Sequence, residues 1–374
     1  MSIKQEITTY SNLPPGGASQ LKDSNVIYFK KKSVLVNQYV GTSSRLINNF
    51  LHYMLYIMFI LPVQHRRIAK KINKSKPEIF IAYHSWMTKS PILMRYIMAK
   101  KIIYICHEPL REYYDLLHIS TQSIFDKLIN LLRLPIKHVD AKNISETENL
   151  IVVANSKFSK ANIDKAYSVN SVVIYPGIDL NKYALAYRGR KFTRKDQCVA
   201  ISVGVLNKLK NQEYLISSIA KIDILIRPSL ILAGNGGDKR YIRYLQKLAT
   251  YHDVDLSIKL NLNKTQLIKE LQSADIFLFS PIAEPFGLVV LEAMAAGLPI
   301  IATDTGGGYT EILTPNNAIL SSAIDENIFA NDIVTLQKNS NRRKKMSQKN
   351  QVDVKKYSSN IMNENLWHII QHST

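Results

Sequence analysis

The segment Ser280–Leu313 limits the possible folds of this chain more than any other, and it reads SPIAEPFGLVVLEAMAAGLPIIATDTGGGYTEIL. The short apolar run 274–279 before it has the length of a buried strand. Helix-forming residues then fill 286–296 and stop at Gly297. A second apolar strand, 299–303, follows the glycine. The order of strand, helix and strand predicts a βαβ unit, and therefore an α/β fold with parallel sheets.

The start of the predicted helix has the features of a phosphate site. The first backbone N–H groups of a helix have no partner inside it, and the helix dipole attracts an anion. Two acids frame this place, Glu284 on the loop and Glu292 about two turns into the helix. Glu292 could accept hydrogen bonds from ribose hydroxyls, and Glu284 could bind a second polyhydroxyl group. The alternative is a helix-capping acid and a solvated acid.

Three phrases in fixed order carry a family resemblance: Glu-Pro-Phe-Gly, Leu-Glu-Ala-Met-Ala-Ala-Gly-Leu-Pro-Ile and Thr-Asp-Thr-Gly-Gly. Together they resemble the donor-site signature of retaining glycosyltransferases of family 4, the group 1 type. That family has the GT-B fold, in which two doubly wound Rossmann-like domains face each other across a cleft. The resemblance is strong over 150–313, moderate over 78–112 and thin before residue 78.

The resemblance implies transfer of a sugar from a nucleotide-diphospho-sugar donor to a glycan or lipid-linked acceptor, with retention of configuration. The sugar nucleotide would be a co-substrate, and no cofactor or obligate metal would be needed. Asp253 and Asp255 do not change this expectation, because no third ligand lies near them in the sequence. The pathway would be the synthesis of a cell-surface polysaccharide or glycolipid.

Three residues are implied as catalytic: His107, Glu284 and Lys210. His107 ends the apolar strand 101–107, at the edge where open α/β sheets bind ligands. In the family, the histidine there contacts the transferred sugar, which would become oxocarbenium-like beside Glu284. Lys210 would neutralise the leaving diphosphate as a point charge. Away from this resemblance, a lone histidine is usually structural and a loop lysine usually solvated.

A larger set of residues is implied in donor binding. These are Gly16, Gly17, Lys208, Asn261, Leu262, Phe286, Gly287, Leu288, Val289 and Glu292. The two N-terminal glycines follow a weak first strand and would let the backbone approach the diphosphate closely. The backbone near Asn261 would face the nucleotide base, and the segment that begins at Phe286 would offer N–H groups to the diphosphate.

Two departures from the family keep another function open. The family places an arginine directly after the glycine at position 204 and a lysine five residues later; Lys210 matches the lysine, but Val205 replaces the arginine. Lys208 is the candidate substitute. The first βα unit is also abridged. The alternative is a non-catalytic GT-B homologue that binds nucleotide or serves as an assembly subunit, and a sugar-nucleotide epimerase comes third. An oxidoreductase is not favoured, since no Gly-x-Gly-x-x-Gly follows the first strand.

A length of 374 residues allows two domains. We expect an N-terminal acceptor-side domain at 1–182, a nucleotide-sugar-binding domain at 183–354, and a C-terminal helix within 355–374 that packs back on the first domain. The only two cysteines lie far apart without metal-ligand spacing, which fits a reducing cytoplasm. Residues 1–10 are polar, so we expect no secretory signal peptide.

The formal net charge of +20 favours an anionic partner, either a phosphate-bearing ligand or an acidic membrane surface. Nucleic acid is not expected, because no helix-turn-helix, zinc or RNA-recognition pattern is present. The apolar run 51–63, followed by basic residues, is shorter than the ~20 residues that span a bilayer. Our favoured interpretation is a buried helix with a basic tail. The other is an interfacial helix on the inner face of the cell membrane.

Overall fold

The structure is a computed structural model that describes residues 8–11, 25–28, 54–85, 88–114, 130–188, 192 and 198–372. The chain forms two compact units, Met1–Tyr56 and Ile57–Thr374. In the first unit, strands β1 (Thr8–Ser11) and β2 (Asn25–Tyr28) pair in parallel. Gly16 and Gly17, which the sequence assigns to donor binding, lie outside the described residues.

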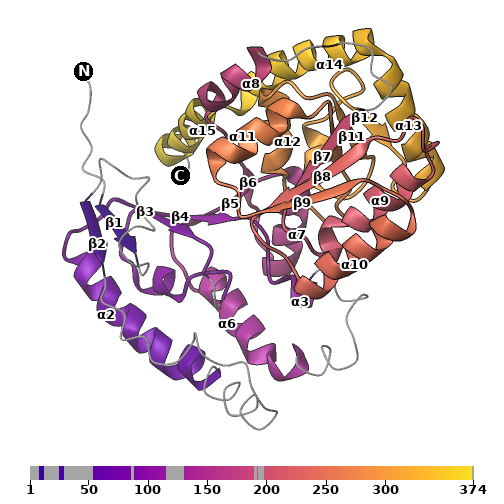
Figure 1. Ribbon diagram of the computed structural model, residues 1–374. Coiled ribbons are helices and arrows are strands. Elements are labelled where there is room, and N and C mark those ends of the chain that lie inside the picture. The colour runs from indigo at the N-terminus through magenta and orange to yellow at the C-terminus, as the bar shows by residue number, and fades with distance from the viewer. Residues whose placement is uncertain are drawn as a thin grey trace. The chain divides into compact units, whose positions relative to one another are not determined.

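The second unit contains two parallel sheets, and the first has the strand order β3-β4-β5-β6. Its strands are β3 (Ile79–Tyr83), β4 (Lys101–Cys106), β5 (Leu150–Ala154) and β6 (Val172–Val173). Its helices are η1 (Tyr56–Ile60), α2 (Leu61–Asn73), η2 (Ile92–Tyr96), α3 (Arg111–Tyr114), α6 (Leu134–Ser145) and α7 (Lys157–Tyr167). In Figure 1, α2 and α6 lie on the same side of this sheet, and both pack against η2.

The end of the chain packs on this first sheet. After η3 (Leu180–Tyr183) and the whole second sheet, η6 (Val354–Tyr357) leads into α15 (Ser359–His372). Ile370 of α15 is buried with Ile103 and Val153 of the sheet, and its carbonyl accepts a 2.8 Å hydrogen bond from Lys101 Nζ. The C-terminal helix therefore contacts the first sheet, although the second sheet precedes it in the sequence.

The second sheet has six parallel strands in the order β12-β11-β10-β7-β8-β9. They are β7 (Val199–Val203), β8 (Ser229–Gly234), β9 (Leu256–Leu260), β10 (Ile276–Phe279), β11 (Ile300–Thr303) and β12 (Ile319–Ser321). Strands β8 and β9 lie on one side of β7. The chain then returns to place β10, and after it β11 and β12, on the other side of β7. This reversal is the point at which open α/β sheets bind ligands, outside the carboxyl ends of the strands.

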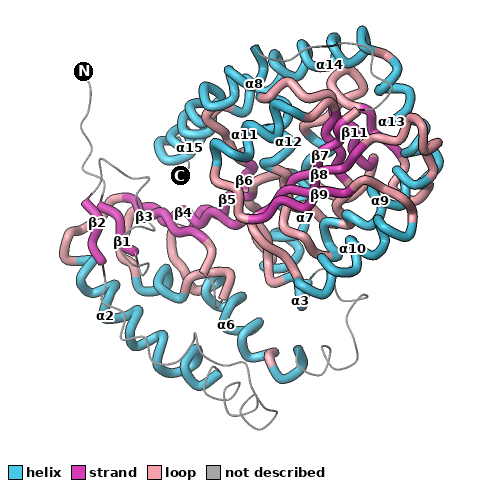
Figure 2. The backbone as a smooth tube through the Cα atoms, in the orientation of Figure 1, coloured by secondary structure: helices cyan, strands magenta, loops and turns pink. Residues whose placement is uncertain are grey.

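Helices cover both faces of the second sheet (Figures 1 and 2). One face carries α8 (Ala184–Arg188), α11 (Lys264–Ser273) and α12 (Leu288–Ala295), and the other carries α9 (Gln212–Ala220), α10 (Lys239–Tyr251) and α13 (Glu326–Lys338), with α14 (Ser340–Asp353) after them. The short turns η4 (Lys208–Lys210) and η5 (Gly308–Glu311) follow β7 and β11. Alternate residues of β7 serve opposite cores, Ile201 on the α12 side and Ala200 on the α9 side, as a doubly covered strand requires.

The α/β class and the two parallel sheets agree with the sequence prediction, and the element bounds differ in detail. The helix predicted at 286–296 begins two residues later, at Leu288, and ends one residue earlier, at Ala295. Within the part of the chain that the structure describes, no helix is both long and apolar enough to cross a membrane.

One expectation of the sequence is wrong in part. The favoured interpretation of the run 51–63 was a buried helix, but only one face of the described part is buried. Phe59, Ile60 and Val63 are 62%, 49% and 47% exposed. The run has apolar residues on all sides of the helix, so periodicity could not indicate which side would meet the core.

Candidate donor site and catalytic residues

The candidate site forms where β7 and β10 end. The loop after β7 is fixed to the loop after β8, because Leu206 N donates to Gly236 O at 3.1 Å and Asp238 N donates to Leu206 O at 2.9 Å. On its other side, the turn η4 is fixed to the loop after β10, since Ile282 N donates to Leu209 O at 2.9 Å. These backbone bonds bring η4 beside the Glu-Pro-Phe-Gly loop.

Lys210 and Glu284 form an ion pair in this arrangement. Asn207 caps the short turn that carries the lysine, with its side chain accepting from Lys210 N at 3.1 Å. The side chain of Lys210 also lies along the backbone of Gly204, where a Cβ atom would meet it at 3.8 Å. The side chains of both partners are largely shielded from solvent, at 27% exposed for the lysine and 12% for the glutamate. The two predicted catalytic residues of this domain are therefore direct neighbours.

The backbone of Glu284 is held by the glycine run after β11. Glu284 N donates to Gly306 O at 2.7 Å, and Gly308 N donates to Glu284 O at 2.8 Å. Gly306 and Gly307 have φ angles of +123° and +140°, which side chains rarely allow. A Cβ atom on Gly307 would collide with the carbonyl of Glu284. The three glycines thus permit the close approach that fixes the position of this carboxylate.

Helix α12 begins directly after the same loop. Gly287 is its N-cap residue, with a φ of +91°, and a Cβ there would meet Tyr309 at 3.0 Å. Phe286 is buried in the core, while Leu288 is exposed. The N–H groups of the first helical turn, which includes Leu288 and Val289, have no acceptor within the helix. The positive end of the dipole therefore lies at the end of the loop that carries Glu284.

Glu292 lies within helix α12, and its carboxylate already has an ion-pair partner. It forms an ion pair with Lys264, the first residue of α11. Burial, together with the nearby Glu292, raises the pKa of Tyr183. Asn261 and Leu262 come after β9 rather than within it, and Asn261 has a φ of +57° and donates from its backbone N to Gly234 O at 2.8 Å. The predicted base residues thus lie on the loop after β9, and the predicted ribose residue lies in helix α12.

The two positions that the family comparison made uncertain are both exposed. The side chain of Val205 is 44% exposed, and its carbonyl accepts a 3.0 Å hydrogen bond from Gln212 Nε2. Lys208 is exposed at the start of η4, two residues from Lys210. The position that holds arginine in the family therefore lies on the surface of this loop, with a lysine on the adjacent turn.

His107 follows β4 in the first sheet, as predicted. Asn155 Nδ2 lies 3.3 Å from its Nδ1, and the ring of His84 meets its ring edge-on with centroids 5.4 Å apart. Burial, His84 and Lys89 together lower the pKa of His107, against the opposing effect of Glu108. The imidazole is therefore neutral near pH 7 and can act as a hydrogen-bonding group rather than as a cation.

Arg111 connects the loop of His107 to the loop of Glu284. Its Nη2 donates to Ala283 O at 2.6 Å, and its Nε pairs with Glu108 at 2.5 Å. Lys89 pairs with the same Glu108 at 2.9 Å. Burial alone would raise the pKa of Glu108, but Arg111 and Lys89 outweigh it and hold the pKa below its usual value. The carboxylate is thus charged and anchors the arginine that reaches the donor loop.

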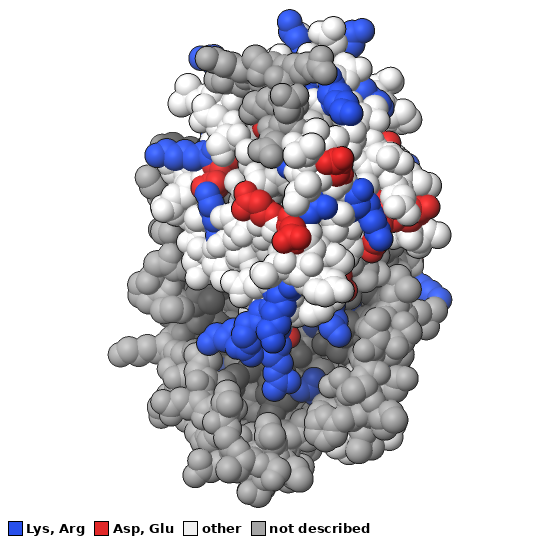
Figure 3. Space-filling view, turned by 45° about the vertical axis from the view of Figure 1, so that its right-hand side comes forward, with Lys and Arg blue, Asp and Glu red and all other residues white. Residues whose placement is uncertain are grey.

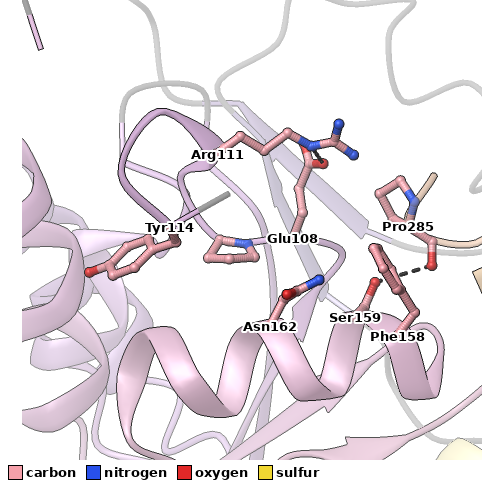
Figure 4. A pocket seen from close by; sticks show the side chains of 8 residues that line it. Glu108, Arg111, Tyr114, Phe158, Ser159, Asn162 and Pro285 are labelled. Atoms are coloured by element: carbon pink, nitrogen blue, oxygen red, sulfur yellow. Dashed lines mark hydrogen bonds and ion pairs between the residues drawn. The ribbon is translucent and has the colours of Figure 1, made fainter. Parts of the chain in front are cut away.

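A small pocket of about 20 Å³ lies beside this arginine. Figure 4 shows Arg111 reaching over Glu108, and Phe158, Ser159 and Asn162 rising from α7. Ser159 Oγ donates to Pro285 O at 3.2 Å, and Ser156 Oγ donates to the same carbonyl at 2.6 Å. The loop Ala283–Pro285 is therefore held from the first-sheet side by three side chains.

Glu311 makes a second connection, which the sequence did not indicate. Its carboxylate accepts from Lys157 N at 2.9 Å and from Phe158 N at 2.7 Å, at the N-terminus of α7. Tyr175 OH donates to it at 2.9 Å. The one sequence feature that could have marked Glu311 is its place three residues after the glycine run. Its hydrogen-bond partners lie far away in the chain, so no local sequence pattern predicts them.

The loops and first turns at one edge of the second sheet carry Lys210, Lys208, Glu284, Phe286, Gly287, Leu288, Val289, Asn261 and Leu262. Glu292 lies in the second turn of α12. His107 lies on the first sheet and is connected to them through Arg111. Asp253 and Asp255 are exposed on the turn before β9. Among the described residues, no three His, Cys, Asp or Glu side chains form a group that could hold a metal ion.

Comparison with known proteins finds glycosyltransferases that match this chain in sequence and in fold. The sequence model of the family "Glycosyl transferases group 1" matches residues 186–353. The uncharacterized glycosyltransferase MJ1607 of Methanocaldococcus jannaschii is 27% identical over 68% of this chain and 65% of its own. The alpha-1,3/1,6-mannosyltransferase ALG2 of Rhizomucor pusillus is 24% identical over 74% of this chain and 67% of its own. The ALG2 of Kluyveromyces lactis is matched over 50% of its length, so the chain spans half to two thirds of these relatives.

Solved structures share the fold at low sequence identity. Anabaena HepE, determined in complex with UDP and glucose, has a TM-score of 0.66 at 16% identity, over 97% of this chain and 91% of HepE. WaaG, a glycosyltransferase involved in lipopolysaccharide biosynthesis, has a TM-score of 0.63 at 15% identity, over 99% of this chain and 92% of WaaG. Residues 186–353 therefore match the glycosyl transferases of group 1, and the chain has the GT-B fold.

Proposed function

We propose that this protein is a retaining glycosyltransferase of family 4 that moves a hexose from a nucleotide-diphospho-sugar to a glycan or lipid-linked acceptor. The observation that carries the proposal is the pairing of Lys210 with Glu284 next to the N-terminus of α12. One cation, one carboxylate and a helix N-terminus at a strand-order reversal are the groups that a diphospho-sugar needs. The pathway would be cell-surface polysaccharide or glycolipid synthesis.

The donor would take over contacts that the protein now makes with itself. Lys210 would turn from Glu284 to the diphosphate, and the first N–H groups of α12 would bind the same anion. Glu284 would then accept hydrogen bonds from hydroxyls of the sugar. Glu292, now paired with Lys264, would accept from the ribose hydroxyls. The nucleotide base would lie against the backbone near Asn261.

In the transfer step, the bond between the anomeric carbon and the diphosphate oxygen breaks, and its electron pair leaves with the diphosphate. The acceptor hydroxyl oxygen bonds to the anomeric carbon on the same face, and its proton passes to a diphosphate oxygen. Lys210 and the α12 N-terminus stabilise the negative charge that develops. Neutral His107 would hydrogen-bond the sugar as its positive charge grows, and the lysine and helix dipole would replace an obligate metal.

The charge of the chain supports an anionic donor and an anionic environment. The formal net charge is +20, and Figure 3 shows a cluster of Lys and Arg side chains on the face shown, with others scattered over it. The relatives named above include mannosyltransferases, which supports a hexose donor, and HepE was determined with UDP. We further propose a cytoplasmic location at the inner face of the cell membrane, where a lipid-linked acceptor would be presented.

A second candidate is a non-catalytic homologue that binds nucleotide or serves as an assembly subunit. The exposed Val205, in place of the arginine of the family, is the observation that favours it. Such a protein would retain the Glu292 site and bind the nucleotide, but it would release no sugar.

Acceptor-dependent release of nucleoside diphosphate separates the two functions. The protein would be incubated with UDP- and GDP-hexoses, with and without a membrane glycolipid extract, in buffer containing a chelator of divalent metals. The proposal predicts release that needs the extract and survives the chelator, with a product whose anomeric configuration by NMR equals that of the donor. Nucleotide binding without release for any combination would instead establish the non-catalytic function.

A further inference from the structure

The helical segment of η1 and α2 buries a regular stripe of residues. Ile57, Leu61, His65, Ala69 and Ile72 are all buried, and they follow one another at spacings of three and four residues. This is the repeat of one helix face that packs on a core. The opposite face of this helical segment is the exposed one in the described part of the chain.

That opposite face begins with large apolar side chains. Met58, Phe59, Ile60 and Val63 are all exposed, and the Phe59 ring is 62% exposed. A helix that packs on a soluble core normally carries polar residues on its outer face. Apolar residues scattered singly over a surface need no explanation, but four within six residues form one patch that gains free energy when it leaves water.

The same face becomes basic further along the helix. Arg67, Lys70, Lys71 and Lys74 are exposed in the turns that follow Val63. The sequence contains no Asp or Glu between Asp23 and Glu78, so no acid of this segment offsets these charges. Arg66 is also exposed, with its guanidinium 5.0 Å from the centre of the Tyr96 ring. We define the outer surface from Met58 to Lys74 as the apolar–basic face.

We propose that the apolar–basic face binds the surface of an anionic lipid bilayer. The apolar end would enter the boundary between headgroups and acyl chains, and the basic end would lie among anionic headgroups, so that α2 lies along the surface. This inference specifies the contact behind the proposed membrane location, but it does not depend on the transfer chemistry. The apolar end matches the acyl-chain boundary, and the basic end matches the layer of anionic headgroups.

A second copy of this chain is the less suitable partner for the same face. In a two-fold dimer the face meets its own equivalent, so each basic end would lie against the basic or the apolar end of the other copy, and neither end contains an acid that could neutralise it. Anionic lipids can supply many negative charges with no fixed geometry. The row of lysines and arginines, rather than the apolar residues alone, therefore selects the bilayer.

Vesicle co-sedimentation tests this proposal with three matched variants of the full chain. The first replaces the exposed apolar residues, Phe59→Ser with Val63→Ser. The second removes three charges from the end of α2 and the residue after it, Lys70→Gln with Lys71→Gln and Lys74→Gln. The control removes three charges from the exposed basic run of α14, Arg342→Gln with Lys344→Gln and Lys345→Gln. All of these side chains are exposed, so the fold should tolerate each change.

We expect the wild type to bind vesicles of phosphatidylcholine with about one third phosphatidylglycerol, and to bind less as salt rises. Loss of three charges from α2 should weaken binding on the order of 100-fold, since each basic residue near an anionic surface contributes about fivefold. The Phe59 and Val63 variant should also bind more weakly, and the α14 variant should stay within about twofold of the wild type.

Three results would overturn the proposal. These are no binding to anionic vesicles, an equal loss in the α2 and α14 variants, and a dimer that the Phe59 and Val63 changes dissociate. Sugar-nucleotide binding, measured by thermal shift on the same proteins, keeps this test separate from the proposed function. An α2 variant that loses vesicles but keeps the nucleotide supports the surface, and a wild type that binds vesicles but no nucleotide contradicts only the proposed donor site.

Discussion

At the scale of single residues, Lys210 is the group on which the proposed chemistry depends most. It is the basic side chain paired with Glu284, and its turn is fixed by backbone bonds to the donor loop. A preorganised cation at a developing diphosphate contributes on the order of 10²-fold or more to the rate. We expect Lys210→Ala to lower kcat by at least that factor, measured as nucleoside diphosphate release.

Lys208→Ala is the matched comparison, because the two lysines share one short turn. If Lys208 substitutes for the arginine of the family, its loss should lower kcat by about tenfold or more. If only Lys210 acts on the diphosphate, kcat should change by less than about twofold. Equal kcat in Lys210→Ala and the wild type would remove the lysine from the proposed mechanism.

Val205 allows the opposite experiment, a gain of function. Its side chain is exposed on the loop after β7, so an arginine there meets no core residue. We expect Val205→Arg to raise kcat/KM by about tenfold if the absent cation limits the activity. Val205→Met is the control for side-chain size. An arginine variant that folds but equals the methionine variant would show that position 205 is not limiting.

At the scale of elements, Glu311 joins the second sheet to helix α7 of the first. Its carboxylate accepts two backbone N–H groups at the helix start, as an N-cap side chain does, although it comes from another part of the chain. Loss of a cap costs about 1 kcal/mol. We expect Glu311→Ala to lower the free energy of unfolding by that amount, measured in urea, with exposed Glu364→Ala as the control. No change relative to Glu364→Ala would mean that the contact does not persist in solution.

Helix α2 should make the stability of the protein sensitive to acid. His65 lies on its buried face, where burial lowers the pKa to about 4, and its Nδ1 finds no hydrogen-bond partner among the described residues. The unfolded chain binds a proton at a pKa near 6.5, whereas the folded chain does not until about pH 4. Stability is therefore full above pH 6.5 and falls as the pH drops from 6.5 towards 4.

The two pKa values imply a loss of about 3 kcal/mol over this range. We expect His65→Leu to unfold at nearly the same urea concentration at pH 7 and pH 5, while the wild type unfolds earlier at pH 5. His368→Leu, on the exposed side of α15, should keep the acid sensitivity of the wild type. An equal slope in His65→Leu and the wild type would contradict the buried neutral histidine.

At the scale of the whole molecule, the sequence predicted what local patterns encode. The βαβ unit around Gly287, the position of Lys210 after β7 and the place of His107 after β4 all follow from strand ends and turn residues near them in the chain. The sequence could not predict the bond from Arg111 to Ala283 or the cap by Glu311. Both join residues more than a hundred positions apart, and either side chain reads as a solvated charge in the sequence.

The sequence also could not predict which side of α2 faces outward. The apolar run 51–63 has no polar face, so the favoured prediction was a buried helix with a basic tail. The packing of η2 against one side decided which residues are buried and left Phe59 and Val63 on the surface. The direction in which a uniformly apolar helix faces is decided by its tertiary neighbours.

The central claim is that the second sheet binds a nucleotide-diphospho-sugar with Glu292 on the ribose. The most direct measurement is calorimetric binding of a panel of sugar nucleotides to the wild type and to Glu292→Ala, with exposed Glu364→Ala as the control. The account predicts selective binding of one donor, weakened at least about tenfold in Glu292→Ala and unchanged in the control. No binding across the panel, or equal affinity in Glu292→Ala, would contradict it.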